Sequence, residues 1–259
     1  MPATPLTRTT RHLYRGTAVT LSALALAGLG TGAAFAGGQD PSTYGTSRPV
    51  RDTTATAAVG VLVREDLDGG HFCTASVVDS PDGNVIMTAA HCLDGETDDL
   101  VFVPGYHEGA APYGIWRITS VAVDDRWSAE QDEDHDVAFA VVEARGARQV
   151  QDVVGAHPLA TGATATGGPV RVTGYPGTSE TPLTCLNIPT AYGASQLRIA
   201  CADFATGTSG SPWVDTDGRV VGLIGGHEGG GDTAAVSYSP VLSASTRKLY
   251  ERAVATAGR

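Results

Sequence analysis

The sequence is poor in charge, and in positive charge above all. Only 17% of its 259 residues are charged, and 17 Lys and Arg stand against 28 Asp and Glu, a formal net charge of −11. A chain this acidic lacks the basic surface that nucleic acids and anionic membranes attract, so we expect neither as a partner. The CxxC and HExxH patterns of zinc sites are absent, and we expect no metal and no cofactor. No repeat of fixed period occurs, which disfavours propellers and solenoids.

Long apolar runs are missing after residue 36. The first 36 residues are typical of an export signal, because Arg8, Arg11 and Arg15 precede the apolar stretch TAVTLSALALAGLG, and AFA then ends at residue 36. A membrane anchor is the disfavoured alternative, since the stretch is short and rich in Gly, Ala and Thr. Removing this signal leaves 14 Lys and Arg against 28 acids, a formal charge of −14. We therefore expect a secreted, extracellular protein that does not bind membranes after signal cleavage.

Cysteine is scarce as well, and all four cysteines lie in the exported part of the chain. They are Cys73, Cys92, Cys185 and Cys201. An even number in an exported chain favours disulfides over a metal site. Three pairings are possible, and the sequential one closes two short loops.

Short β-rich runs separated by turn residues fill most of the chain. Residues 37–56 are polar and broken by Pro and Gly, which indicates an extended arm or a propeptide. About six strands are expected in 57–143 and a second set in 165–242. Residues 243–257 fit a helix better than a strand. The pattern predicts an all-β protein with two antiparallel barrels or sandwiches.

Three polar residues stand where catalysis would need them. Ser209 lies in GTSGSPW, residues 207–213, between glycines that permit an unusual turn and a close approach of substrate. Ser211 is a weaker candidate, because Pro212 restricts it to an extended backbone. His91 ends an apolar strand in MTAAHC, residues 87–92, directly before a cysteine.

A carboxylate is expected to orient that histidine. Asp136, in DHDVAFAVV, directly precedes an apolar run and would stand at the edge of the core. A carboxylate there needs a donor such as an imidazole N–H. Asp132 and Asp134 are alternatives, but they belong to the acidic run AEQDEDHD, which is more typical of a solvated loop.

Together, TAAHC, HDVAF and GTSGSP resemble the three motifs of the chymotrypsin-like (trypsin-like) serine peptidases, and the secreted bacterial members with GxSGSP above all. The resemblance covers residues 57–257. It implies two six-stranded antiparallel β-barrels with the active site between them, and a C-terminal α-helix. It also implies His91 as base, Asp136 as its orienting acid and Ser209 as nucleophile, with the N–H groups of Gly207 and Ser209 as oxyanion hole.

The same resemblance extends to the disulfides and the substrate strand. Cys73–Cys92 resembles the family disulfide that brackets the catalytic histidine, and Cys185–Cys201 would then staple the second barrel near the specificity pocket. The run LIGG resembles the edge strand that pairs with the substrate backbone. Its residues Ile224, Gly225 and Gly226, and the following His227, are candidate substrate-binding residues.

Three departures from the family pattern bear on specificity and activation. Thr208 replaces an Asp that pairs with a freshly cut N-terminus in many members, so we expect activity without that ion pair. Asp203 stands six residues before Ser209, where trypsin-like members carry the acid that selects Lys or Arg. Ala205, however, stands where those members have a cysteine of the pocket disulfide. Glutamate-selective members carry a His where this chain has Ile224, with His227 three residues later.

The sequence thus predicts a monomeric secreted serine endopeptidase that acts on polypeptides, with Lys or Arg preferred before the cleaved bond. The alternatives are an endopeptidase with Glu or apolar preference there, and an inactive homologue that binds peptide or protein. A serine esterase is disfavoured, because Ser211 replaces the second glycine of GxSxG and the histidine comes first in the chain.

Overall fold

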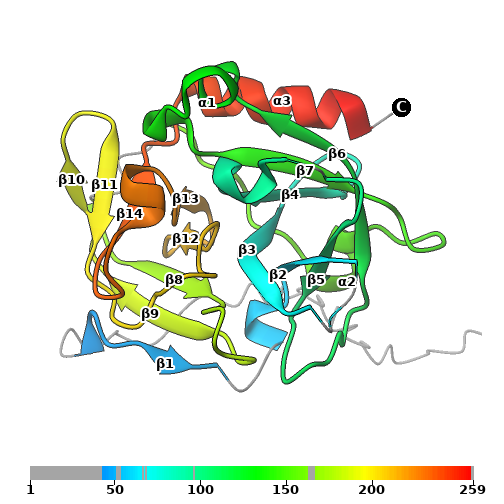
Figure 1. Ribbon diagram of the computed structural model, residues 1–259, viewed down its shortest axis with the longest axis horizontal. Coiled ribbons are helices and arrows are strands. Elements are labelled where there is room, and N and C mark those ends of the chain that lie inside the picture. The colour runs from blue at the N-terminus through cyan, green and yellow to red at the C-terminus, as the bar shows by residue number, and fades with distance from the viewer. Residues whose placement is uncertain are drawn as a thin grey trace, which may run out of the picture. The chain divides into compact units, whose positions relative to one another are not determined.

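The computed structural model describes residues 43–50, 54–65, 67, 69–95, 97–162 and 167–257. The predicted export signal, residues 1–36, lies outside the described residues. The elements are mainly β-strands with a few short helices and one longer C-terminal helix (Figure 1). None of the helices in these ranges is long and apolar enough to cross a membrane.

The first half of the fold is a closed barrel of six antiparallel strands in the order β2-β3-β4-β7-β6-β5. This confirms the prediction of six strands in residues 57–143. The strands are β2 (Val59–Arg64), β3 (His71–Val78), β4 (Val85–Thr88), β5 (Leu100–Pro104), β6 (Trp116–Val123) and β7 (Ala138–Val142).

Burial on both faces explains why several of these strands are continuously apolar. Every residue of β4, β5 and β7 is buried. One face of each strand fills the barrel, and for β4 and β7 the C-terminal helix α3 (Ala244–Ala257) packs against the strands from outside. Figure 1 shows α3 lying along β6 and β7. The predicted C-terminal helix is therefore present.

The second half consists of two antiparallel sheets. One has the order β1-β9-β8-β12-β13 and the other β10-β11-β14. The strands are β1 (Arg48–Pro49), β8 (Val170–Gly174), β9 (Leu183–Asn187), β10 (Thr190–Tyr192), β11 (Gln196–Ile199), β12 (Pro212–Val214), β13 (Val220–Leu223) and β14 (Ser237–Pro240).

Strand pairing in this half differs from the predicted six-stranded barrel, because the described strands form two separate sheets here. The N-terminal arm occupies the outer edge of β9, with Arg48 opposite Thr184 (Figure 1). The arm also reaches the end of the other sheet, since the Ala202 amide donates to Gly45 O at 3.4 Å. The predicted arm is thus a strand of the second half as far as it is described.

Short helices connect the strands at places that the sequence did not mark. They are η2 (Thr54–Thr56), η3 (Ala90–Leu93), α1 (Asp125–Glu130), η4 (Glu133–His135), α2 (Val150–Val154) and η6 (His227–Gly230). The acidic run expected as a solvated loop contains the end of α1 and all of η4. Side-chain caps stabilise both, because Asp124 accepts from Arg126 N and Asp132 from Asp134 N.

Candidate active site

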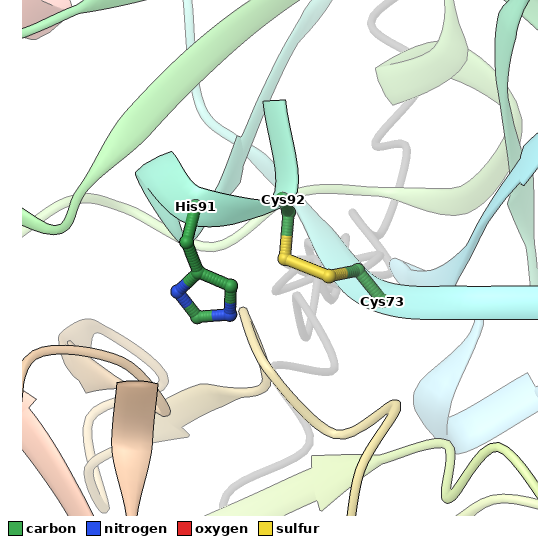
Figure 2. Close-up of side chains that lie close together, drawn as sticks. All are labelled: Cys73, His91 and Cys92. Atoms are coloured by element: carbon green, nitrogen blue, oxygen red, sulfur yellow. A yellow bond between two sulfur atoms is a disulfide. The ribbon is translucent and has the colours of Figure 1, made fainter. Parts of the chain in front are cut away.

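The helical turn η3, directly after β4, presents His91. The disulfide Cys73–Cys92 ties this turn to β3, and Figure 2 shows the imidazole and the Cys92 side chain leaving the same turn. The ligand atoms of His91 and the two cysteines lie within 4.8 Å of one another. Both sulfurs are consumed in the disulfide, so the cluster supports the histidine and is not a metal site.

Asp136 is fully buried and accepts three hydrogen bonds. Its Oδ2 lies 2.7 Å from His91 Nδ1 and accepts from Gly226 N at 2.7 Å, while its Oδ1 accepts from His91 N at 2.9 Å. These donors offset the cost of burying a carboxylate. They also fix the imidazole with Nδ1–H toward the acid, which leaves Nε2 free to act as a base. Asp132 and Asp134 do not share this contact.

The neighbourhood of Asp136 requires glycine on the second half of the fold. A Cβ on Gly225 would lie 3.0 Å from Asp136 Oδ2 and 3.3 Å from Ala89 Cβ. Gly226 adopts φ 78°, which lets its amide point at the carboxylate. The predicted substrate strand therefore also supplies a donor to the acid, a role that the sequence did not suggest.

Trp127 of α1 lies beside the histidine. Its ring centroid is 6.3 Å from that of His91, and its Nε1 donates to Asp94 Oδ1 at 2.9 Å. The indole is almost fully buried. It thus forms an apolar wall next to the His91 imidazole, and no sequence motif had singled it out.

The turn that carries Ser209 is anchored on β3 of the first barrel. Thr74 N donates to Ser209 O at 2.8 Å, and Thr74 Oγ1 donates to Gly207 O at 3.0 Å. Thr74 follows Cys73 in the chain, so the same segment of β3 holds both the histidine turn and the serine turn. His91 and Asp136 are thus in direct contact, and the backbone of Ser209 is bound to the strand whose Cys73 holds the histidine turn.

Two glycines of this turn are required by space as well as by backbone angle. Gly207 has φ 97°, and a Cβ there would lie 2.4 Å from Gly177 N. Gly210 has φ 85°, and its Cβ would lie 2.0 Å from Thr74 O. Both distances are far shorter than any real contact, so side chains at either position would push the turn off its support.

A cavity of about 320 Å³ opens beside Ser209. Phe204 and Ile224 supply apolar wall, Thr206 and Thr208 supply polar wall, and the loop after β13 closes one side. The remaining lining residues are Ala205, Glu228, Gly229, Gly230, Gly231, Asp232, Thr233 and Ala234. Among the described residues, the lining includes the two acidic residues Glu228 and Asp232 and no positively charged side chain.

Of the five predicted substrate-binding residues, Ile224 lines the cavity, whereas Asp203, Gly225, Gly226 and His227 are not among its lining residues. Asp203 is exposed with φ 67°, and the chain then turns so that the neighbouring Phe204 is buried and faces the cavity in its place. His227 points elsewhere too: its Nδ1 lies 3.3 Å from Glu133 Oε2 and its Nε2 lies 3.3 Å from Tyr192 Oη. Glu228 and Asp232, which the sequence reasoning missed, supply the carboxylates near Ser209.

The second disulfide pairs Cys185 of β9 with Cys201 after β11. Both bonds match the pairing that the family resemblance implied. Cys185–Cys201 joins the two sheets of the second half and stands two residues before Asp203. It therefore anchors the segment that runs into the cavity wall.

Comparisons with known proteins identify the family and the fold. The family model of the trypsin-like peptidase domain matches residues 73–223, which is more than half of the chain. The search of curated proteins gave no match.

Solved structures of proteases share the fold. Protease Anisep from Arthrobacter nicotinovorans is 25% identical in sequence, with a TM-score of 0.68. The match covers 81% of this chain and 99% of the Anisep chain. The thermostable serine protease AL20 from an extremophilic microorganism is 27% identical with a TM-score of 0.68, covering 78% of this chain and 99% of its own. A Glu endopeptidase, at 18% identity and a TM-score of 0.67, covers 81% of this chain and 96% of its own, and it shows the fold alone. With its closed barrel, the matched domain and these serine protease neighbours, the chain belongs to the trypsin-like peptidase family and has a chymotrypsin-like fold.

Proposed function

We propose that the protein is a secreted serine endopeptidase that acts through Ser209, His91 and Asp136. The observation that carries this is the 2.7 Å contact between His91 Nδ1 and the buried Asp136 carboxylate. Ser209 Oγ attacks the carbonyl carbon of the cleaved bond while His91 Nε2 takes the hydroxyl proton. His91 then gives this proton to the leaving amine, which leaves an acyl-enzyme on Ser209. In the second step His91 takes a proton from a water molecule, the water oxygen attacks the acyl carbon, and the proton returns to Ser209 Oγ as the acid product leaves.

The oxyanion of the tetrahedral intermediate is assigned to the amides of Gly207 and Ser209. Within the described residues, neither amide has a recorded hydrogen bond to another protein group. The positive φ of Gly207 and the anchoring of the turn on Thr74 support a fixed direction for both N–H groups. Fixed donors of this kind stabilise the transition state without reorganisation.

Activity without a newly cut N-terminus is part of the proposal. Thr208 is buried, and its Oγ1 donates to Ala205 O at 2.7 Å. Ser211 Oγ donates to Thr208 O at 2.6 Å. The position is thus neutral and satisfied within the turn, so the shape of the turn needs no ion pair.

Lys or Arg is the proposed residue before the cleaved bond. The support is the cavity beside Ser209, whose lining holds Glu228 and Asp232 and no cation. Negative charge at the mouth of a cavity attracts a cationic side chain and repels a glutamate. Asp203, the residue expected in this role, is not among the lining residues, so Glu228 and Asp232 are proposed for the role in its place.

Secretion is proposed from the sequence of residues 1–36 and from the two disulfides, which persist in oxidising compartments.

The proposed function is tested by mass spectrometry of the sites that are cut in an unfolded protein mixture. The chain without its export signal is compared with its Ser209→Ala variant. Cuts after Lys and Arg that vanish in the variant are expected. Cuts after Glu or apolar residues would support the serine peptidase mechanism but reject Lys or Arg as the residue before the cleaved bond, the P1 residue. An absence of cuts by both proteins would favour the inactive homologue that binds peptide or protein.

A further inference from the structure

A single carboxylate links the segment that carries Asp136 to the loop that walls the cavity. Glu133 of η4 stands three residues before Asp136 in the chain. Its Oε1 accepts from Glu228 N at 2.8 Å, and its Oε2 lies 3.3 Å from His227 Nδ1. Glu133 thus holds two successive residues of η6 across the junction between the two halves of the fold.

The loop held by Glu133 is closed by two backbone hydrogen bonds of its own, from Gly229 N to Gly226 O at 2.8 Å and from Gly231 N to Glu228 O at 3.2 Å. Glu228 has φ 51°, and Gly229 and Gly230 also adopt positive φ. Glycines lose more backbone entropy on ordering than other residues, and a left-handed glutamate adds strain. Residues 228–231 form one wall of the cavity beside Ser209. The two internal hydrogen bonds shape the turn, and contacts from outside the loop, such as those of Glu133, fix where this wall lies against the rest of the fold.

Gln196 and two tyrosines contact the same region as Glu133. Gln196 Nε2 donates to Glu133 O at 3.0 Å and to Asp134 Oδ1 at 2.7 Å, and Gln196 Oε1 faces His227 N at 3.4 Å. The His227 ring packs against both Tyr192 and Tyr238, at centroid distances of 5.0 and 4.8 Å, and the two tyrosine rings also contact each other at 4.8 Å. Among these contacts, only the Glu133 carboxylate reaches the backbone of the loop beyond residue 227.

We propose that Glu133 is a positioning residue that holds the cavity wall in the shape that binds the substrate side chain. The inference rests on the proposed function and extends it to a residue whose side chain lines no part of the cavity and has no contact with the triad. The Glu133 carbonyl oxygen, which every variant keeps, accepts from Asp136 N at 3.4 Å. Glu133 does not line the cavity, so it acts through Glu228 and His227. Asp136 keeps its own donors when the Glu133 side chain is removed, because Gln196 still holds the backbone of η4 and Gly225 N still donates to Tyr238 O at 3.0 Å.

The effect should therefore fall on substrate binding and spare the chemical step. In Glu133→Ala we expect KM to rise about tenfold for the larger P1 side chain that the wild type cleaves best, as for a lost charge-assisted hydrogen bond. For an Ala P1, which does not reach the wall, KM should stay within about twofold. kcat should change less than KM for both substrates.

Glu133→Gln provides the conservative rescue. Its amide oxygen still accepts from Glu228 N, and its NH₂ group can donate to Nδ1 of a neutral His227. We expect it to restore most of the lost binding. Glu130→Ala is the matched control, since Glu130 is an exposed acid in the same run, at the end of α1. It removes one charge at a residue with no recorded contact to the loop.

The experiment measures steady-state kinetics on peptide nitroanilides with Arg, Phe, Glu or Ala at P1, for the wild type and the three variants. Amide hydrogen exchange of the peptides covering residues 226–231 is measured on the same proteins. The fastest exchange is expected in Glu133→Ala, a smaller increase in Glu133→Gln, and no change in Glu130→Ala. This second readout does not depend on activity, so it separates a failure of this inference from a failure of the proposed function.

Specific outcomes would overturn the proposal. Unchanged exchange in the loop of Glu133→Ala would reject the anchoring role, whether or not the protein is a peptidase. Equal KM effects for Arg and Ala at P1, or an equal loss in Glu130→Ala, would assign the effect to overall charge or folding. If Glu133→Ala fails to fold, Glu133→Gln is compared with the wild type alone. Its loop exchange and its KM for the larger P1 side chain should then both exceed the wild-type values by a small amount. Wild-type values of exchange and of KM would count against the role of Glu133.

Discussion

Thr74 N donates to Ser209 O at 2.8 Å, so a strand of the first barrel holds the turn of the second half that carries the proposed nucleophile. The Thr74 side chain reinforces this link, since its Oγ1 donates to Gly207 O and accepts from Tyr175 N, each at 3.0 Å. Because Cys73 precedes Thr74 and pairs with Cys92, the histidine and the serine share one support. Two adjacent residues of β3 therefore hold the turns that carry the proposed base and the proposed nucleophile.

Replacing Thr74 by Val should weaken both stability and catalysis. The valine keeps the shape but leaves the Tyr175 amide and the Gly207 carbonyl without their partner, which costs about 1–3 kcal/mol for a buried group. A loosened serine turn should lower kcat by up to about a hundredfold, as small displacements of reacting groups do. Denaturant unfolding and kcat measure the two effects. Thr74→Ser keeps the hydroxyl and should stay close to wild type; equal losses in Ser and Val would reject the role of the hydroxyl.

Replacing Asp136 by Asn should lower kcat by about 10⁴-fold with little change in KM. The carboxylate accepts from three donors, and an amide offers an NH₂ group to one of them. In either orientation of the amide, one backbone N–H, that of His91 or that of Gly226, loses its acceptor. When the NH₂ group lies beside Gly226 N, it also faces His91 Nδ1, so the imidazole is held with Nδ1 unprotonated and Nε2 can no longer act as the base. Steady-state kinetics on a peptide nitroanilide checks this. A loss below about tenfold would show that Asp136 does not set the tautomer.

Much of this arrangement follows from local sequence, because strands, turns and motifs are encoded in neighbouring residues. The six strands of the first barrel follow from their apolar runs, and the disulfide pairing follows from the family resemblance. The role of Thr74 could not be predicted, since a threonine in a strand usually signals only β-propensity. The two-residue strand β1 escaped prediction for a similar reason: Arg48 and Pro49 pair with β9 through contacts far along the chain.

Specificity was the harder part of the site, because pocket walls depend on how loops turn. Counting back from Ser209 places Asp203 at the position of the family acid. The left-handed backbone at Asp203, φ 67°, leaves it exposed and buries Phe204 instead. Glu228 and Asp232 reach the cavity through a glycine-rich loop whose course no periodicity encodes. Backbone angles, unlike residue types, are not visible in one sequence.

Deleting the arm should destabilise the second half of the fold. A chain beginning at residue 51 loses the bonds of Gly45 N to Leu186 O at 2.9 Å and of Val50 N to Pro182 O at 2.8 Å, together with the contacts of Gly45 and Ser47 with Ala202. At about 0.5–1.5 kcal/mol for each net hydrogen bond, we expect a loss of about 2 kcal/mol and a Tm lower by about 4–8 °C. A chain beginning at residue 43 is the control. Equal Tm values for the two chains would mean that the arm is dispensable and that a propeptide could extend through it.

His157 should make the protein less stable in mild acid. Burial lowers the pKa of its imidazole below the usual value of 6.5, and the hydrogen bond from Nδ1 to Gly218 O offsets this only in part. The unfolded chain therefore binds a proton more readily than the folded one, so this contribution to stability is full above pH 6.5 and is lost as the pH falls through and below that value. The measurement is Tm between pH 7.5 and 5 for the wild type and His157→Gln, whose amide can still donate to Gly218 O. The wild type should lose more Tm than the variant on acidification; parallel curves would show that other groups govern the acid response.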